Sequence, residues 1–471
     1  MMKQSIDCMI LPESTKAMIA DLPGKIRVHV THKDKRLELT HSVSWRAQSP
    51  KRDGGVVVSP KKSFQTVLGF GAAFTDAACY LLDRLPPLTQ KQFLNELFNP
   101  GLIGLNCCRV CVGASDYATK AYSYDDDGPD PTLEHFSIDH DKAYILPLIK
   151  HARIICPELF LLASPWSPPG WMKVGGSMCG GMIRRKHFAT YAGYLLKFLR
   201  SYSEEGVSVD ALTVQNEVDT DQEGRMPACF WGQGNETRFI VEHLGPRLRK
   251  LGLDTKIWIL DHNYDLWGRV LGQLDDSSLH QLVDGVAWHG YFGHPSAMTV
   301  VHNSHPDKHM YWTEGGPEDL HDPNLETNWA HWGARFTAIM RNWSECIIAW
   351  NLALDEKGKP NIGPFSCAGL VTIDSQSQEI RRSGQYWALA HFSSAVRRGA
   401  HRIQSSGSVR SVSHVAFRNP DQSCAMVLTN PGRSRTLKVC LESSHEAEIE
   451  LPADSLVTLV WNSSGNEAAS L

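Results

Sequence analysis

Residues 67–112 read VLGFGAAFTDAACYLLDRLPPLTQKQFLNELFNPGLIGLNCCRVCV, and they contain the pattern that predicts the fold class. Two short apolar runs, at 67–74 and 103–112, flank a segment at 89–98 whose apolar residues have helical spacing and which Thr89 is expected to cap. A strand, a helix and a second strand in this order are typical of a βαβ unit in a parallel sheet.

The same alternation continues through the middle of the chain. Six further apolar runs, separated by segments with helical spacing, bring the expected strands to eight. Eight strands with intervening helices over about 300 residues predict an α/β fold, a (β/α)8 TIM barrel, which we place at residues 66–394. The six runs are LFLLASPW (159–166), DALTVQNE (210–217), KIWILDH (256–262), DGVAWHG (284–290), HMYWTEG (309–315) and CIIAWNL (346–352).

The two ends of the chain have a different pattern. Short segments such as IRVHV (26–30), SCAMVLTNP (423–431) and TLKVCLE (436–442) resemble strands, and those near the C-terminus are separated by Gly, Pro, Ser and Asn. No helical segment of comparable length separates them. We therefore expect residues 1–65 plus 395–471 to build one β-sandwich side domain beside the barrel.

The composition excludes several classes of protein. The 471 residues include 47 Lys and Arg against 51 Asp and Glu, a net charge of −4 that gives no electrostatic case for a nucleic-acid partner. No run approaches the ~18 apolar residues of a spanning helix, so membrane insertion is not expected. The apolar run at 8–11 is too short for the core of a signal peptide, which favours a cytoplasmic protein.

The cysteines point to a reducing compartment. Most of the 12 cysteines lie in apolar runs, and without an export signal we expect them to be reduced and unbridged. Cys108 and Cys111 form a CxxC, but no second CxxC accompanies it and no HExxH occurs. The sequence therefore predicts no metal site and no cofactor.

Polar and aromatic residues end nearly every expected strand. In barrels of this kind the active site lies at the carboxyl ends of the strands, whereas packing alone would favour Val, Ile and Leu there. Glu217 ends the fourth run and Glu314 the seventh, and these strands face each other across an eight-stranded barrel. A lone Glu would more simply be a structural ion-pair partner, but two at facing strand ends favour catalysis.

Paired carboxylates are the requirement of glycoside hydrolysis. One carboxylic acid protonates the leaving oxygen, and in retaining enzymes a second carboxylate about 5–5.5 Å away attacks the sugar. We expect Glu217 and Glu314 at about 4.5–6 Å, with Glu217 carrying the raised pKa because its charge would lie beside that of Glu314.

Six motifs in the right order give a specific resemblance over residues 65 to 395. The chain resembles a retaining glycoside hydrolase of the glucosylceramidase family, a clan A, family 30-like enzyme. The motifs are GFGAAFTDAA (69–78), LLASPWSPPGWMK (161–173), TVQNE (213–217), VAWHGY (286–291), WTEGG (312–316) and AWNLAL (349–354).

The resemblance implies roles for individual residues. Glu217 matches the acid/base, Glu314 the nucleophile, and Asn216 the residue that bonds the 2-hydroxyl of the sugar. It also implies that Asp76, Trp166 and Trp350 hold the sugar. The residues expected to orient the nucleophile are Arg109, His289 and Tyr291.

The expected reaction is hydrolysis of a β-glucosidic bond in a carbohydrate or glycolipid, with glucosylceramide-like or β-1,6-glucan substrates foremost. A β-xylosidase or β-fucosidase of the same family, or a sugar-binding barrel without activity, are the alternatives. Two departures from the family pattern bear on specificity: VDTDQEGRMPACFW (218–231) follows Glu217, and the fifth run ends in Asp-His-Asn (261–263). The sugar, the linkage, exo or endo action and the oligomeric state are left open.

Overall fold

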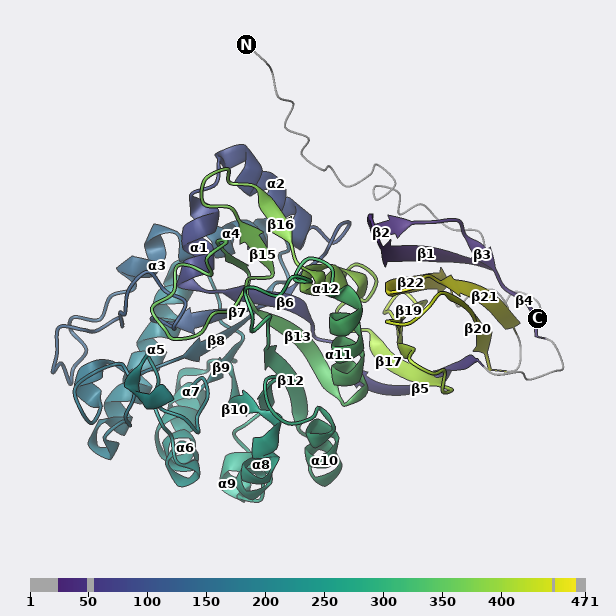
Figure 1. Ribbon diagram of the computed structural model, residues 1–471. Coiled ribbons are helices and arrows are strands. Elements are labelled where there is room, and N and C mark those ends of the chain that lie inside the picture. The colour runs from purple at the N-terminus through teal and green to yellow at the C-terminus, as the bar shows by residue number, and fades with distance from the viewer. Residues whose placement is uncertain (1–23, 49–54, 443–444, 463–471) are drawn as a thin grey trace, which may run out of the picture.

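The computed structural model describes residues 24–48, 55–442 and 445–462. The run at 8–11 lies outside these ranges. All eight expected strands form, and they close into one parallel barrel in the order β6 to β13, with β13 pairing back to β6 (Figure 1). The strands are β6 Gly69–Phe74, β7 Cys107–Val112, β8 Phe160–Pro165, β9 Ala211–Thr213, β10 Lys256–Asn263, β11 Gly285–His289, β12 His309–Glu314 and β13 Ser344–Asn351.

Helices follow the strands and surround the barrel. Thr75 begins the first of them, since its side chain accepts a hydrogen bond from Ala78 N. The expected cap at Thr89 is wrong: the helix starts at Pro87, whose fixed φ and missing N–H suit the first turn. The helices are α1 Asp76–Asp83, α2 Pro87–Phe98, α3 Asp139–Ala143, α4 Ile145–Ile155, α5 Phe188–Glu204, α6 Gln233–Arg238, α7 Gly245–Leu251, α8 Trp267–Leu274, α9 Ser277–His280, α10 Ser296–Ser304, α11 Trp329–Arg341 and α12 Gly384–Ser393.

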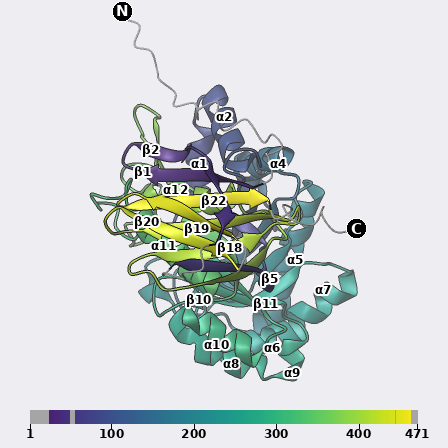
Figure 2. The ribbon, with the colours of Figure 1, turned by 90° about the vertical axis from the view of Figure 1, so that its right-hand side faces the viewer.

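Strands from both ends of the chain share one sheet beside the barrel (Figures 1 and 2). Near one end of this sheet β1 pairs antiparallel with β22, so the first and last described strands are neighbours. The predicted fold class is confirmed. The strands of this sheet are β1 Lys25–His32, β2 Lys35–Leu39, β3 Val43–Ser44, β4 Arg46–Ala47, β5 Val56–Thr66, β17 His401–Ser406, β18 Ser413–Arg418, β19 Ser423–Asn430, β20 Arg435–Leu441, β21 His445–Leu451 and β22 Ser455–Asn462; a separate small sheet holds β14 Ala353–Leu354, β15 Val371–Ile373 and β16 Ile380–Arg382.

Two barrel helices, α11 and α12, lie between the barrel strands and this sheet (Figure 1). His391 of α12 is fully buried there, with its ring nitrogens 2.8 Å from Thr31 Oγ1 and 2.7 Å from Thr458 Oγ1. Burial lowers the pKa of His391 to about 3, so the imidazole is neutral and bonds both ends of the chain to the barrel.

The CxxC is part of the barrel core. Cys108 and Cys111 are buried free thiols on β7. They pack in different apolar clusters, Cys108 around the barrel and Cys111 with Trp166 and Trp350. Successive side chains of a strand point to opposite faces, so a spacing of three separates the two sulfurs.

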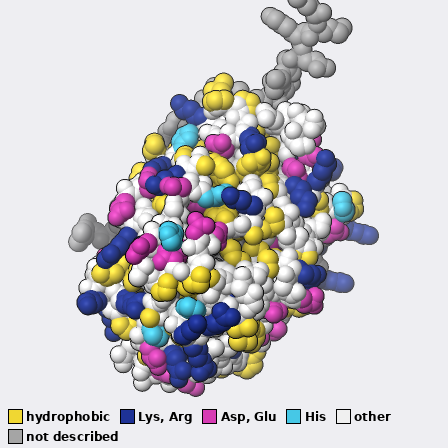
Figure 3. All heavy atoms as spheres, turned by 90° about the vertical axis from the view of Figure 1, so that its left-hand side faces the viewer, with side chains coloured by type: hydrophobic (Ala, Val, Ile, Leu, Met, Phe, Trp, Pro, Cys, Tyr) yellow, Lys and Arg dark blue, Asp and Glu magenta, His cyan; other side chains and the backbone are white. Residues whose placement is uncertain are grey.

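The outer surface carries mixed charges. On the face of the barrel turned away from the β domain, Lys and Arg are interspersed with Asp and Glu (Figure 3). Within the described ranges, none of the helices has the length and apolarity needed to cross a membrane.

Candidate active site

A cavity of about 480 Å³ opens at the carboxyl ends of the barrel strands. Both predicted catalytic carboxylates line it. So do four further predicted site residues, whereas Arg109 and His289 are fully buried. The lining residues are Asp116, Trp166, Asn216, Glu217, Thr220, Gln222, Arg225, Met226, His262, Asn263, Tyr291, Phe292, Glu314, Glu318, Trp350, Phe365, Ser366 and Cys367.

Glu217 stands on a strained turn just beyond β9. Its φ of +54° is in the left-handed region, which a non-glycine residue enters at a cost of about 1–3 kcal/mol. The hydrogen bonds that hold this turn run from Asn216 N to Pro165 O, at 2.7 Å, and from Glu217 N to Asp261 O, at 2.9 Å. The neighbouring strands therefore fix the direction of the Glu217 side chain.

The two oxygens of Glu217 have different partners. Gln222 Nε2 donates to Oε2 at 2.7 Å. On the other side, His289 Nδ1 lies 3.4 Å from Oε1 and His262 Nδ1 lies 3.8 Å from it. The loop that departs from the family pattern thus supplies a direct partner of Glu217.

Glu314 is the last residue of β12, and it is held by charged and polar donors. Arg109 Nη1 donates to Oε2, and Tyr291 donates its hydroxyl to Oε1 at 3.1 Å. His289 Nε2 lies 3.8 Å from Oε2. Arg109, Tyr291 and His289 are the residues expected to orient this carboxylate, and all three contact it.

Arg109 organises the floor of the cavity. Its Nη2 donates to Asn216 Oδ1 at 2.8 Å and to Asp261 Oδ2 at 2.6 Å. Its guanidinium lies 4.7 Å from the ring centre of Trp166 and 5.6 Å from that of Trp350, and these two rings stack at 5.0 Å. One buried cation therefore positions two carboxylates, an amide and two aromatic rings.

Asp261, which was not among the predicted site residues, is the second organising centre. It accepts hydrogen bonds from Thr213 and Thr313 as well as from Arg109, and its Oδ1 lies 3.0 Å from His289 Nε2. Burial alone would raise its pKa, but the charge of Arg109 and the bond from His289 hold that pKa far below its usual range. Asp261 is thus a carboxylate, and His289 donates Nε2–H to it.

A bulge in β10 aims Asp261 at this network. Leu260 and Asp261 have φ values of +74° and +48°, and the pairing of β10 with β11 shifts register there. A bulge redirects a side chain that the regular alternation of a strand would send elsewhere. Sequence alternation alone cannot predict it.

The partners of Glu217 act on its pKa against the expected direction. Burial raises both, but a hydrogen bond from His289 and the charges of His262 and His289 bring the pKa of Glu217 down to about 2. At Glu314 burial prevails over the charges of His289 and Arg109, and the pKa is raised. The sequence could not show that His289 sits closer to Glu217 than to Glu314.

His289 is therefore a cation in this site. Burial would lower its pKa, but the charge of Glu314 and the hydrogen bonds to Asp261 and Glu217 raise that pKa to about 9. The ring is fully buried and touches three carboxylates.

Asp76 does not line the cavity. As the first residue of α1 it turns its carboxylate away, where it accepts hydrogen bonds from Thr119 N and Tyr144 Oη and meets His140 Nε2, each at 2.6 Å. Asp116, four residues beyond β7, lines the cavity instead, and its buried Oδ1 has no hydrogen-bond partner in the described structure. We therefore add Asp116 to the candidate sugar ligands, and the role predicted for Asp76 stays a prediction.

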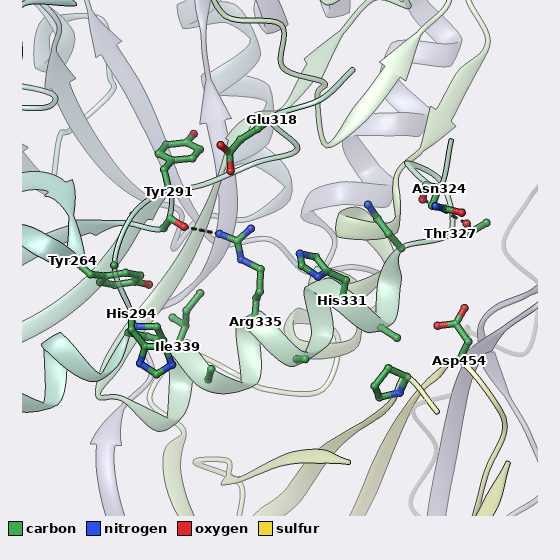
Figure 4. Close-up of a pocket in the computed structure, with 18 residues that line it drawn as sticks. Tyr264, Tyr291, His294, Glu318, Asn324, Thr327, His331, Arg335, Ile339 and Asp454 are labelled. Atoms are coloured by element: carbon green, nitrogen blue, oxygen red, sulfur yellow. Dashed lines mark hydrogen bonds between the residues drawn. The ribbon is translucent and has the colours of Figure 1, made fainter. Parts of the chain in front are cut away.

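A second cavity of about 880 Å³ adjoins the first, and Tyr291 and Glu318 line both. It lies between the loop after β11, helix α11 and turns of the β domain. Figure 4 shows His331 and Arg335 projecting into it from α11, with Arg335 donating to Gly290 O at 2.6 Å.

Comparison with known proteins agrees with this geometry. An endo-1,6-beta-D-glucanase of Neurospora crassa is 32% identical over 364 residues, which cover 74% of each chain. Putative glucosylceramidase 4 of Caenorhabditis elegans is 31% identical over 470 residues, covering 93% of this chain and 89% of the relative. The solved structure of the endo-beta1,6-glucanase BT3312 superposes with a TM-score of 0.85 at 28% identity, over 94% of this chain and 100% of that one.

Two family models match in sequence. The glycosyl hydrolase family 30 TIM-barrel domain matches residues 67–396, and the family's beta sandwich domain matches residues 399–459. Together they match the barrel and the C-terminal strands of the side domain. The chain therefore belongs to glycosyl hydrolase family 30, a clan A family of retaining glycoside hydrolases.

Proposed function

We propose that Glu314 is the nucleophile and Glu217 the acid/base of a double displacement on a β-glucoside. The observation that carries this assignment is the contrast between their partners. Arg109 and Tyr291 both donate to Glu314, and these bonds stabilise the anion required for attack against the burial that raises its pKa. Glu217 stands on the side lined by Thr220 and Gln222, where a leaving group would lie.

The proposed reaction has two steps. Glu314 attacks the anomeric carbon while Glu217 gives its proton to the leaving oxygen, which forms a glycosyl ester on Glu314. Glu217, now ionised, then takes a proton from water, and the water attacks the ester carbon. Asn216 and Asp116 face the bound sugar in this scheme, and Trp166 and Trp350 pack against it.

Azide distinguishes the two carboxylates. Glu217→Ala should keep activity on a nitrophenyl β-glucoside, whose leaving group needs no proton, and azide should then yield a β-glucosyl azide. Glu314→Ala should lose turnover, and azide should give the α-glucosyl azide. A β product from Glu314→Ala, or no rescue of Glu217→Ala on this activated substrate, contradicts the assignment.

We further propose that the leaving group is itself a sugar, so that the natural substrate is a β-1,6-linked glucan. Thr220, Gln222 and Arg225 supply polar contacts beyond Glu217. The second cavity continues from the first through Tyr291 and Glu318 and offers room for further sugar units. Both features suit a hydroxyl-rich chain.

A lipid-linked glucoside is the second candidate. Two rim residues favour it, because Phe292 and Phe365 line the cavity yet are 68% and 42% exposed. Exposed aromatic rings at a cavity mouth can cover an alkyl chain as well as stack on a sugar.

The dependence of kcat/KM on substrate length distinguishes a β-1,6-glucan from a lipid-linked glucoside as the natural substrate. On β-1,6-gluco-oligosaccharides, kcat/KM should rise with each added sugar beyond the disaccharide, and should exceed kcat/KM on glucosylceramide in detergent micelles. His331→Ala, in the second cavity, should lower kcat/KM for the long oligomers and leave that for nitrophenyl β-glucoside unchanged. A preference for glucosylceramide, or no gain with length, would favour the second candidate.

A further inference from the structure

Two imidazoles converge on one oxygen of Glu217. His262, at the end of β10, is 9% exposed, and its Nδ1 has no hydrogen-bond partner in the described structure. It lies 3.8 Å from Glu217 Oε1, while His289 Nδ1 approaches the same oxygen at 3.4 Å. The ligand atoms of these three residues all lie within 4.8 Å of one another.

These separations approach those of a tetrahedral zinc site. Zn–N and Zn–O bonds of about 2.0–2.2 Å place two ligands of one tetrahedron about 3.3 Å apart. The two distances to Glu217 Oε1, 3.4 and 3.8 Å, lie within half an ångström of this value, and the two imidazole nitrogens lie within 4.8 Å of each other. Two His and one Glu are a known ligand set for zinc with one position open, and here that position faces the cavity that Glu217 and His262 line.

The surroundings of His289 fit a metal ligand as well. A ligating imidazole usually donates its other N–H to a carboxylate, which fixes the tautomer. His289 Nε2 lies 3.0 Å from Asp261 Oδ1, and Asp261 is in turn held by Arg109. The cationic ring of His289 carries a proton on each nitrogen. When the proton on Nδ1 is lost, the lone pair of Nδ1 points toward Glu217 Oε1. Gln222 holds the other oxygen of Glu217, which leaves Oε1 for the ion.

We propose that Glu217, His262 and His289 form a binding site for a divalent transition ion, Zn²⁺ or Co²⁺, and that its occupation inhibits the enzyme. The ion is an inhibitor and takes no part in hydrolysis. It binds the oxygen of the acid/base and occupies space next to the leaving group, so it competes with substrate. The inhibition rests on the role proposed for Glu217, whereas the binding does not.

Binding is measured first, without substrate. Titration of the full-length protein with Co²⁺ at about pH 8, where imidazoles bind metals more readily than at acid pH, should give the visible absorption of a low-symmetry site with one ion per chain. Zn²⁺ should displace it. His262→Gln and Glu217→Gln should each weaken Co²⁺ binding at least tenfold, since even residues that only orient a ligand change affinity 10- to 100-fold.

Inhibition is measured second. Zn²⁺ should raise KM for nitrophenyl β-glucoside with little change in kcat, and a chelator should reverse the effect. The Zn²⁺ concentration that halves the rate should be at least tenfold higher for His262→Gln than for the wild type. Each rate is compared with the metal-free rate of the same protein. The matched control is His294→Gln, an exposed His in the second cavity, which should keep the wild-type sensitivity.

Two results would overturn the site: His262→Gln binding Co²⁺ as tightly as the wild type, or wild-type protein giving no stoichiometric Co²⁺ spectrum. If Co²⁺ binds through His262 but Zn²⁺ leaves KM unchanged, the binding site stands and the inhibition is refuted. Melting curves of each variant identify any loss of the fold.

Discussion

Tyr291→Phe tests the electrostatic control of the proposed nucleophile. The change removes one hydroxyl that donates to Glu314 Oε1 at 3.1 Å, while Arg109 continues to hold Oε2. A hydrogen bond to an ionised acceptor contributes about 1.5–3 kcal/mol. If that interaction is fully used when Glu314 attacks, kcat/KM should fall about 10- to 150-fold.

The same substitution should move the acidic limb of the pH profile. Loss of a donor to the anion raises the pKa of Glu314, and Glu314 must be ionised to attack. The acidic limb of kcat/KM should therefore move to higher pH by about one unit or more. The basic limb, which reports the acid, should move less.

The assay is kcat/KM on nitrophenyl β-glucoside across the pH range, with Tyr264→Phe as the matched control. Tyr264 Oη is buried and has no hydrogen-bond partner in the described structure, so its removal should leave the limb in place. If kcat/KM of Tyr291→Phe stayed within twofold of the wild type and its acidic limb did not move, the hydroxyl of Tyr291 would have no part in stabilising the Glu314 anion.

Two further predictions concern the partners of Glu217 and its loop. His289→Asn should lower activity and move the basic limb of the kcat/KM profile to higher pH by about one unit or more, because the hydrogen bond and the charge that lower the pKa of Glu217 are lost. A basic limb that does not move contradicts this electrostatic account. Lys173→Met should lower the free energy of unfolding by about 3 kcal/mol or more, measured by urea denaturation, since its buried Nζ donates to Ser167 Oγ, Met178 O and Ala228 O and the substitution removes all three charge-assisted hydrogen bonds. A change under about 1 kcal/mol speaks against this role.

The barrel could be predicted because its strands obey local rules. Each of the eight apolar runs is buried on both faces, so each is short and nearly continuous in sequence. Glu217 and Glu314 then follow from the rule that active sites gather at the carboxyl ends of barrel strands. The helix start predicted at Thr89 is wrong because a stronger signal for the first helical turn, Pro87, lies two residues earlier.

Other features of the site have no signal in the sequence pattern. Asp76 and Asp116 both follow strand ends. The sequence does not show that Asp76 forms hydrogen bonds with Tyr144 and His140, whereas Asp116 lines the cavity with a carboxyl oxygen that has no partner in the described structure. Asp116 lies in the loop that follows the second barrel strand, a position at which the barrel rule also predicts site residues. The position of Asp261 depends on a bulge, which has no signal in the alternation of residues.

The pKa of Glu217 is the property that the sequence could least define, because it depends on the charge balance of the whole network. Arg109 and His289 bring two positive charges to three carboxylates, those of Asp261, Glu217 and Glu314. With one negative charge in excess, such a coupled group can hold an additional proton, which it shares among its members. When Glu314 becomes a neutral ester, two positive charges face two carboxylates and that excess is gone. The pKa of Glu217 should then fall further, and the residue that gave a proton in the first step becomes the base of the second.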